Sequence, residues 1–174
     1  MTTNNTTTQL PTGTWTLDPT ATTITVSAKK LGLFTIPATL TVVSGTIDID
    51  DDHQVTNVDI VADASSYTSR NPKRNEHVTG ADFLDADAHP TIVFRAGNVT
   101  SSDNGLTSNG TVTIKGQTAP VNVTVSNVDV GGATGSFVAT ATVDRNTIGV
   151  DKMPALVIGR HLDITVNATA EKNP

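Results

Sequence analysis

Apolar and polar residues alternate with a period of two along most of this chain. Between residues 23 and 28, for example, Ile24, Val26 and Ala28 alternate with Thr and Ser. The same alternation recurs at 40–50, 58–63, 92–96, 110–115, 121–125, 137–143 and 162–168. One apolar and one polar face per strand is typical of an antiparallel sheet, because the strands of parallel sheets are covered on both faces. The pattern therefore predicts an all-β protein.

Short turn sequences join these segments. They are DDDH at 50–53, SSDNG at 101–105, KGQTAP at 115–120 and GGATG at 131–135. Such residues favour tight connections between neighbouring antiparallel strands. The alternation also changes phase at Ser126 and Asn127, which predicts a β-bulge. About eight strands joined as hairpins can form either a closed barrel or a two-sheet sandwich.

One long interval, residues 65–94, lacks the alternation. Long connections in compact domains are uncommon unless they serve a function or contain structure of their own. Asn71 and Pro72 suit the start of a helix and Gly80 suits its end, so we expect a short helix over 72–79. We expect this connection to close one mouth of the structure that the strands build.

An apolar pair, Phe83 and Leu84, follows the predicted helix and is flanked by Asp82 and Asp85. We expect this pair to act as a plug. Carboxylates and imidazoles in the same segment are the kinds of group that bind zinc. Their spacing matches neither a helical His-x-x-x-His pair nor a calcium loop, so we predict no metal site and assign the acids to caps and turns.

Composition narrows the functional classes. The 174 residues suffice for one domain with a real core, and the net charge is −6 without a basic stripe. Nucleic acid is therefore excluded as an expected partner, because binding it requires a field that neutralises phosphates. The chain has no Cys, which excludes disulfides, thiolate metal sites and a Cys nucleophile.

The first ten residues form a polar tract rich in Thr and Asn. Such a tract cannot bury apolar surface, so we expect a disordered tail over 1–10 and a single β-barrel domain over 11–172. The sequence shows no secretory signal and no apolar run long enough for a membrane span. The expected location is the cytoplasm, or the periplasm or exterior if a signal has been removed.

The expected inward-facing residues are mostly Val, Ile and Ala, and aromatic residues make up only 3% of the chain. Small and branched side chains leave more central space than rings do, which favours a lined cavity. An eight-stranded barrel is wide enough to hold one small ligand. The periodicity alone is equally compatible with a sandwich whose core is filled.

An ordered set of motifs resembles the YceI-like family of polyisoprenoid-binding, lipocalin-like proteins. The resemblance runs from about Gly13 to Glu171. Its motifs are Trp15, Leu17-Asp18, Leu31-Gly32, Ser44-Gly45, Ser66, Thr68, Arg74, Glu76-His77, Asp82-Phe83-Leu84-Asp85, His89-Pro90-Thr91-Ile92-Val93-Phe94, Gly110 to Val125, Asp144-Arg145-Asn146, Gly149 and Ile158-Gly159. The chain departs from the family pattern at Lys30, Ala38 and Leu40, where many members have His, Gly and Phe.

The resemblance implies an eight-stranded extended antiparallel barrel, with a short helix in the 65–90 connection. It further implies a binding or carrier protein, not an enzyme, that holds a long isoprenoid or similar amphiphilic lipid in an apolar tunnel. A bound isoprenoid or quinone-like lipid is the only cofactor we expect. The residues expected to line the tunnel are Val26, Leu40, Val42, Val58, Ile60, Phe94, Val112, Ile114, Val123, Phe137, Val143, Leu162 and Ile164, with Phe34, Phe83, Leu84 and Met153 at its mouths.

A basic cluster at the start of the predicted helix is the candidate head-group site. Arg70, Lys73 and Arg74 oppose the helix dipole unless an anion lies nearby, and helix N-termini bind anions readily. We include Lys30 and His77 as further candidates for contacting a polar or pyrophosphate head group. The alternative is a solvated loop whose cations pair with neighbouring acids.

Two other functional classes stay open. One is an enzyme that acts on a lipid or quinone, with the 70–89 segment as its site. The other is a stress-related β-domain without a stored ligand, which an exposed edge strand could assemble into a homodimer. Asp144 and Arg145 could be read as catalytic, but we expect a structural role, because a buried Arg can bond several carbonyl groups.

Overall fold

The computed structural model describes residues 10–31, 33–102, 105–147 and 158–174. The strands are β1 (Gly13–Leu17), β2 (Thr23–Lys30), β3 (Phe34–Ile49), β4 (Val55–Thr68), β5 (Thr91–Ser102), β6 (Gly105–Ile114), β7 (Gln117–Gly131), β8 (Thr134–Asp144) and β9 (Ile158–Lys172). One helix, α1 (Pro72–Thr79), lies between β4 and β5 in the described part of the chain.

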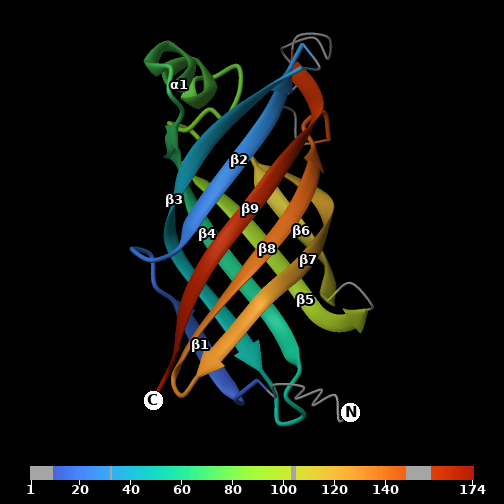
Figure 1. The fold of residues 1–174 in the computed structure, drawn as a ribbon. Helices are drawn as coiled ribbons and strands as arrows, with labels where there is room; N and C mark the ends of the chain where they lie inside the picture. The colour runs from blue at the N-terminus through green and yellow to red at the C-terminus, as the bar shows by residue number, and fades with distance from the viewer. Residues whose placement is uncertain (1–9, 32, 103–104, 148–157) are drawn as a thin grey trace.

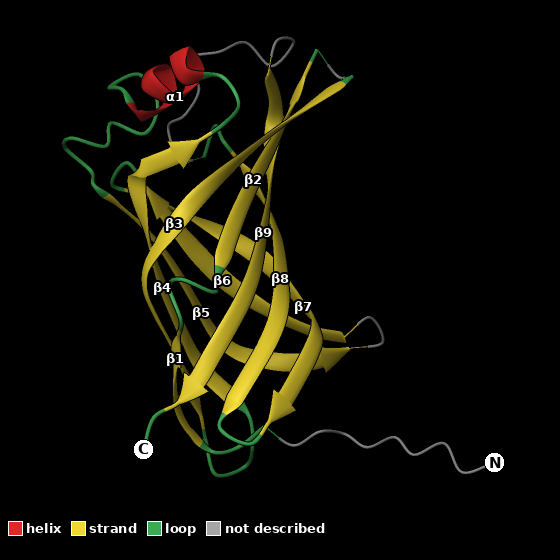
Figure 2. Ribbon diagram, turned by 60° about the vertical axis from the view of Figure 1, so that its left-hand side comes forward, coloured by secondary structure: helices red, strands yellow, loops and turns green. Residues whose placement is uncertain are grey.

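The strands form one closed antiparallel sheet. Its order is β1-β3-β2-β9-β8-β7-β6-β5-β4, and β4 closes the ring by pairing with β3. β1 and β2 each lie between β3 and β9, one toward each end of the barrel, and so share one position in the ring. The structure is therefore an eight-stranded barrel, which confirms the sequence prediction and excludes the sandwich (Figures 1 and 2).

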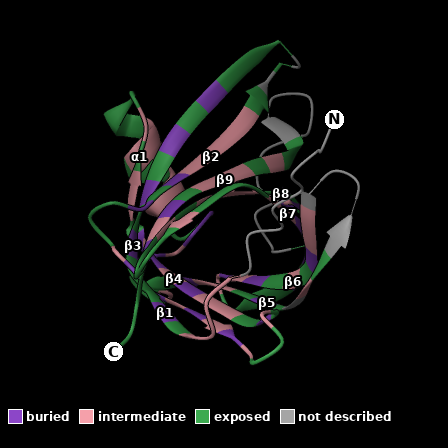
Figure 3. Ribbon diagram, turned by 60° about the horizontal axis from the view of Figure 1, so that its bottom comes forward, coloured by how far each residue is buried: buried purple, intermediate pink, exposed green. Residues whose placement is uncertain are grey.

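The alternation predicted from sequence matches the burial of the strands. Along β3, Ile36, Ala38, Leu40 and Val42 are buried while the residues between them are exposed. Figure 3 shows buried and exposed residues alternating along the strands of the ring. Backbone polar groups are paired in the strand ladders, so the inward face is free to be apolar.

Two local features of the backbone also follow from sequence. The β7–β8 register shifts between Ser126 and Asp129, and Asn127 has a φ of 52°, which confirms the predicted bulge. The β6–β7 connection is tighter than the predicted 115–120 turn, because Gln117 already pairs with Ile114. Both central residues of this two-residue turn, Lys115 and Gly116, have positive φ, as hairpin turns matched to strand twist require.

The predicted short helix is confirmed with its expected boundaries. The side chain of Asn71 caps it by accepting hydrogen bonds from the backbone N–H groups of Lys73 at 3.0 Å and Arg74 at 3.3 Å. Pro72 occupies the first turn, where a missing N–H costs nothing. No helix in the described ranges is long and apolar enough to cross a membrane.

The barrel end opposite α1 is closed by packed side chains. Trp15 and Leu17 of β1 are 4% and 1% exposed, and Trp15 Nε1 donates a hydrogen bond to the carbonyl of Pro11 at 3.1 Å. Leu10 also packs against this part of the core. The rest of the predicted disordered tail, residues 1–9, lies outside the described residues.

At Gly45, β3 packs closely against Leu17 of β1. A Cβ atom at Gly45 would overlap Leu17 Cδ1. We expect Gly45→Ala to lower the free energy of unfolding by about 1–3 kcal/mol, because the extra methyl overpacks the core. Chemical denaturation measures the change.

Gly97→Ala is the matched control, because a Cβ atom there meets nothing within 4 Å. Combining Gly45→Ala with Leu17→Val should recover part of the loss. Equal destabilisation at Gly45 and Gly97 would contradict close packing between β1 and β3.

Candidate functional site

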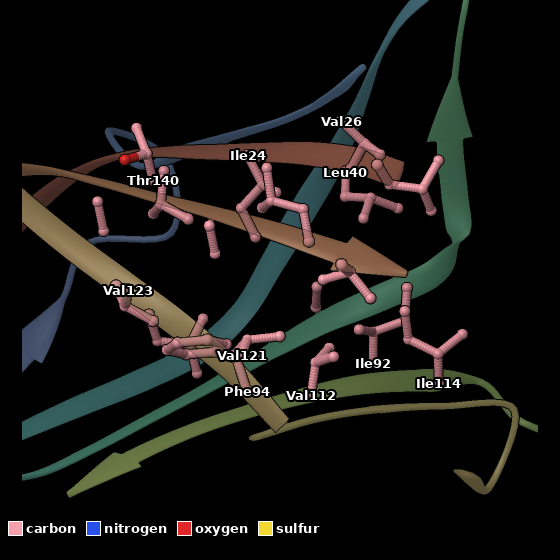
Figure 4. A pocket seen from close by; sticks show the side chains of 18 of the residues that line it. Ile24, Val26, Leu40, Ile92, Phe94, Val112, Ile114, Val121, Val123 and Thr140 are labelled. Atoms are coloured by element: carbon pink, nitrogen blue, oxygen red, sulfur yellow. The ribbon is translucent and has the colours of Figure 1, made fainter. Parts of the chain in front are cut away.

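The barrel encloses an apolar cavity of about 380 Å³. Side chains from facing strands point into it, as Figure 4 shows for Leu40, Phe94 and Val112. The predicted tunnel residues that line it are Val26, Leu40, Val58, Ile60, Phe83, Leu84, Phe94, Val112, Ile114, Val123, Phe137, Val143, Leu162 and Ile164. The interior is therefore a chamber with open space along the axis.

Two of the described tunnel candidates, Val42 and Phe34, do not line the chamber. Val42 is 2% exposed and belongs to the hydrophobic core. Phe34 is 61% exposed at the tip of the β2–β3 hairpin. Met153 lies outside the described residues.

A second, smaller apolar cavity of about 90 Å³ lies toward the end closed by Trp15. Val58, Val99, Val125 and Phe137 line both cavities, so these side chains form the boundary between them. Among the described residues that line this smaller cavity, Ser136 is the one with a hydroxyl group, and none is charged. Apolar side chains thus separate the two cavities, and the smaller one lies on the side away from α1.

The segment after α1 closes the opposite mouth. The backbone N–H of Phe83 bonds to the carbonyl of Gly80 at 3.1 Å, and the N–H of Leu84 bonds to the carbonyl of Val78 at 2.9 Å. This compact turn holds Phe83 and Leu84 at 8% exposure each, against the chamber. The plug expected from sequence is thus placed at the mouth by local backbone hydrogen bonds.

Contacts with the β6–β7 turn hold the plug segment in place. Lys115 Nζ donates a hydrogen bond to the carbonyl of Ala81 at 3.0 Å. The ring of His89 lies against Gly116, where a Cβ atom would approach its Cε1 to 3.2 Å. The segment therefore rests on the barrel rim and not only on its own helix.

The charged and aromatic polar residues of the lining gather at this mouth. Tyr67 comes from the end of β4, Arg74 and His77 from α1, and Arg145 follows β8. The ring of His77 lies 4.9 Å from that of Phe83, so it covers the plug. The chamber thus has one end with cationic groups, and the rest of its length is almost entirely apolar.

Asp144 and Arg145 point in different directions. Asp144 Oδ2 accepts a hydrogen bond from Arg160 Nε at 2.6 Å on the outer surface, where Arg160 is largely exposed. Burial works to raise the pKa of the Asp144 carboxyl, but hydrogen bonds from Asn146 and Arg160 outweigh it and hold the pKa below its usual value. Arg145 is 2% exposed and lines the chamber.

From the sequence we expected a structural role for Arg145. The period-two pattern of β8 indicates that its side chain faces the interior. Phe137, Ala139, Ala141 and Val143 face inward on β8, and Arg145 is the next residue in that series. Its backbone N–H bonds to the carbonyl of Arg160 at 2.9 Å, which continues the β8–β9 ladder by one residue.

The pKa of the Tyr67 phenol reflects the environment of the chamber mouth. Burial raises the pKa of Tyr67, and the positive charge of Arg74 opposes that rise. The two groups therefore interact at the chamber entrance. A cation that favours the phenolate would also favour an anionic group of a ligand in the same place.

The other head-group candidates lie apart from the lining. Arg70, which precedes α1, and Lys73, in its first turn, are exposed at the same end but do not line the chamber. The side chain of Lys30 lies outside the described part of the structure. Among the described residues, no three His, Asp or Glu side chains converge in a manner suited to a metal ion.

A closed antiparallel barrel with an apolar chamber and one polar mouth is the architecture of lipocalin-like binding proteins. Comparison with known families gives the narrower assignment. The chain belongs to the YceI-like family, because the YceI-like domain model matches residues 15–170. The resemblance inferred from the sequence motifs is confirmed.

Relatives and solved structures agree with this assignment. A UPF0312 protein of Vibrio cholerae is 29% identical over 99 residues, which are 53% of this chain and 52% of that protein. The matched region thus spans about half the length of that curated relative.

Two solved structures share the fold. The crystal structure of Burkholderia cenocepacia BcnA has a TM-score of 0.74 at 20% identity, covering 88% of this chain and 98% of that chain. A polyisoprenoid binding domain from Saccharophagus degradans, implicated in plant cell wall breakdown, has a TM-score of 0.67 at 10% identity, covering 91% and 98%. At these identities the likeness shows a common fold.

The interaction at the mouth can be measured directly, because Tyr67 is the only Tyr in the chain. We expect Arg74→Gln to raise the pKa of Tyr67 further, since it removes a positive charge that stabilises the phenolate. A pH titration of the phenolate absorbance gives the pKa.

Lys73→Gln is the control, because it removes a neighbouring helix cation that does not line the chamber. It should leave the Tyr67 titration almost unchanged. A Tyr67 pKa that falls or stays constant in Arg74→Gln would show that these side chains do not meet as described.

Proposed function

We propose that this protein binds one long-chain isoprenoid or quinone-like lipid and acts as its carrier, without catalysing its conversion. The observation that carries the proposal is the chamber itself: an almost wholly apolar space inside the barrel with cations at one end. Its volume of about 380 Å³ lies in the usual range for small-molecule sites.

The distribution of polar groups sets the orientation of the ligand. The tail lies in the main chamber and points toward the smaller cavity beside Trp15, where no charged group is available. The head group lies at the mouth with Arg74, His77 and Arg145. The opposite orientation would bury a polar head among apolar side chains without hydrogen bonds, which costs several kcal/mol.

Apolar burial supplies the affinity in this proposal. Each buried methylene contributes roughly 0.8 kcal/mol, so a prenyl tail can bind tightly with few polar contacts. The YceI-like family and the polyisoprenoid binding domain among the structural neighbours support a lipid of this class.

The lining also favours binding over catalysis. The described residues around the chamber include no Asp or Glu, and their titratable groups are Tyr67, Arg74, His77 and Arg145. His77 has no carboxylate partner within the lining that would orient it as a general base. The arrangement suits the recognition of an anionic or polar head.

A series of prenyl alcohols of increasing length tests the tail site. We expect affinity to rise with each added isoprene unit until the chamber and the smaller cavity are filled, and then to level off, because further units stay in water. Competition with an environment-sensitive apolar fluorophore measures the affinities.

Ala141→Trp should weaken all members of the series by filling the chamber that Ala141 lines. Val138→Trp is the matched control, because Val138 is a neighbouring β8 residue that does not line the chamber. Affinity that is independent of tail length would contradict a tunnel.

The head-group site is tested by comparing a prenyl pyrophosphate with the prenyl alcohol of the same length. We expect Arg74→Gln to weaken binding of the pyrophosphate by about ten- to a hundredfold and that of the alcohol only slightly, because a lost hydrogen bond to a charged group costs about 1.5–3 kcal/mol. Isothermal titration calorimetry measures both ligands.

Arg70→Gln provides the control, since Arg70 does not line the chamber. Equal losses for pyrophosphate and alcohol in Arg74→Gln would remove Arg74 from head-group recognition while leaving the tail site intact. Native mass spectrometry of protein purified from its own cells would then identify the lipid that it carries.

A further inference from the structure

The tip of the β2–β3 hairpin exposes three large apolar side chains next to one another. Leu31, Leu33 and Phe34 are 55%, 81% and 61% exposed. The hairpin extends past the body of the barrel at the same end as α1 (Figures 1 and 2). None of these three side chains contributes to the core or lines the chamber.

This cluster differs from the remaining exposed apolar residues. Val43 and Val128 are 54% and 36% exposed, but each is a single residue on the barrel wall. Single exposed apolar residues are normal on protein surfaces, whereas contiguous ones mark an interaction site. The hairpin tip is therefore a candidate contact surface.

Cations accompany the apolar tip. Lys29 lies at the base of the tip, where its Nζ donates a hydrogen bond to Thr35 Oγ1 at 3.0 Å. Arg70, before α1, and Lys73, within it, are exposed at the same end. The salt bridges of the described residues join Arg95 to Asp59 and Arg160 to Asp144. Lys29, Arg70 and Lys73 are thus not neutralised by a carboxylate in the described structure.

The opposite end of the barrel is more acidic. The β3–β4 turn there carries Asp50, Asp51 and Asp52 in succession. The net charge of the chain is −6, and the end with the hairpin tip and α1 carries Lys29, Arg70 and Lys73 together with the exposed acids Glu76, Asp82 and Asp87. A negatively charged surface is therefore repelled less by this mixed end than by the acidic turn at the other.

We propose that the β2–β3 hairpin tip docks the protein on an anionic lipid bilayer. Leu31, Leu33 and Phe34 enter the interface between head groups and acyl chains, while Lys29, Arg70 and Lys73 face the lipid phosphates. Apolar side chains combined with basic ones are the established chemistry of attachment to anionic membranes. Docking in this way brings the mouth of the chamber to the membrane surface.

The shape of the tip favours a bilayer over a second copy of the chain. In the described pairings, residues 34–38 of β3 bond to β2 alone, so one edge of the hairpin is open. Pro37 stands in that edge and has no N–H, which disfavours addition of another strand. The apolar residues also form a convex tip, which suits insertion better than it suits a flat dimer interface.

This inference rests on surface residues that lie apart from the chamber, so it can fail or hold independently of the proposed lipid carrier. The chain contains no Cys, so Leu33→Cys can be labelled at a single site with a polarity-sensitive fluorophore. We expect a blue shift on mixing with vesicles of phosphatidylcholine and phosphatidylglycerol, and little shift with phosphatidylcholine alone. Label at Asp51→Cys, in the opposite turn, should show no shift with either vesicle.

Co-sedimentation with the same vesicles measures the binding. We expect Leu31→Asn combined with Leu33→Gln to reduce partitioning by about tenfold or more, because it removes most of the apolar surface available for insertion. Val43→Gln combined with Val128→Gln is the matched control and should bind as the unmodified protein does. Raised salt should weaken binding, since the phosphate contacts are exposed.

Two outcomes would overturn the docking surface. One is equal vesicle binding by the tip variant and the unmodified protein. The other is a dimer in sedimentation equilibrium that the tip variant abolishes, which would assign the tip to a second copy of the chain. Affinity for a soluble short prenyl alcohol, measured without vesicles, should be unchanged in the tip variant, and it separates failure of docking from failure of the chamber.

Discussion

Closure of the backbone hydrogen-bond ladder is the constraint on which the rest of this structure depends. Because β4 pairs with β3 and completes the ring, no strand edge has to be covered inside the wall, and the backbone groups of the barrel find partners without help from the interior. The inward side chains are then free to be small. Val, Ile and Ala on opposite walls cannot fill the space between the walls, and a chamber results. A sandwich of the same strands would collapse until its two faces touched, so the cavity is a consequence of topology as much as of composition.

The ends of the ring differ because the connections at each end differ. At one end β1 brings Trp15 and Leu17 into the core, and Gly45 allows this close approach. At the other end the long β4–β5 connection supplies α1 and the pair Phe83 and Leu84, which local backbone bonds hold at the rim. A packed plug of this kind consists of one helix and one turn instead of barrel strands. Local openings cost less where fewer contacts must break, so in the proposed function we assign the entry of the lipid to this end.

The sequence predicted the fold well because each strand carries its own period-two pattern and the helix carries its own cap. Those signals are local, so each strand and the helix could be predicted from their own residues. The same pattern placed most of the chamber lining, since facing inward in a small barrel means facing the axis. The pattern failed where a residue can be in phase with the lining without reaching the chamber. Val42 is buried in the hydrophobic core but does not line the chamber, and Phe34 lies in the part of β3 that extends beyond the barrel. Arg145 lies in phase with the β8 lining, but its burial depends on neighbouring strands that are distant in sequence.

Charge and apolar surface have to be considered together to understand this molecule. A negative protein is repelled by anionic membranes on average, and an enclosed apolar chamber is useless to a lipid that cannot reach it. The repulsion is reduced and the lipid gains access together if the cations and the exposed apolar side chains lie at the end that also holds the mouth of the chamber. The β2–β3 hairpin, which carries Lys29 and Leu33, and α1, which Arg70 precedes, lie at that end, while the β3–β4 turn with Asp50–Asp52 lies at the other (Figure 1). In the proposed docking, the less acidic end faces the membrane, so that orientation follows from long-range charge and attachment from short-range burial. In the same proposal, the cations inside the mouth contact the head group of the ligand, and those outside it contact the membrane surface.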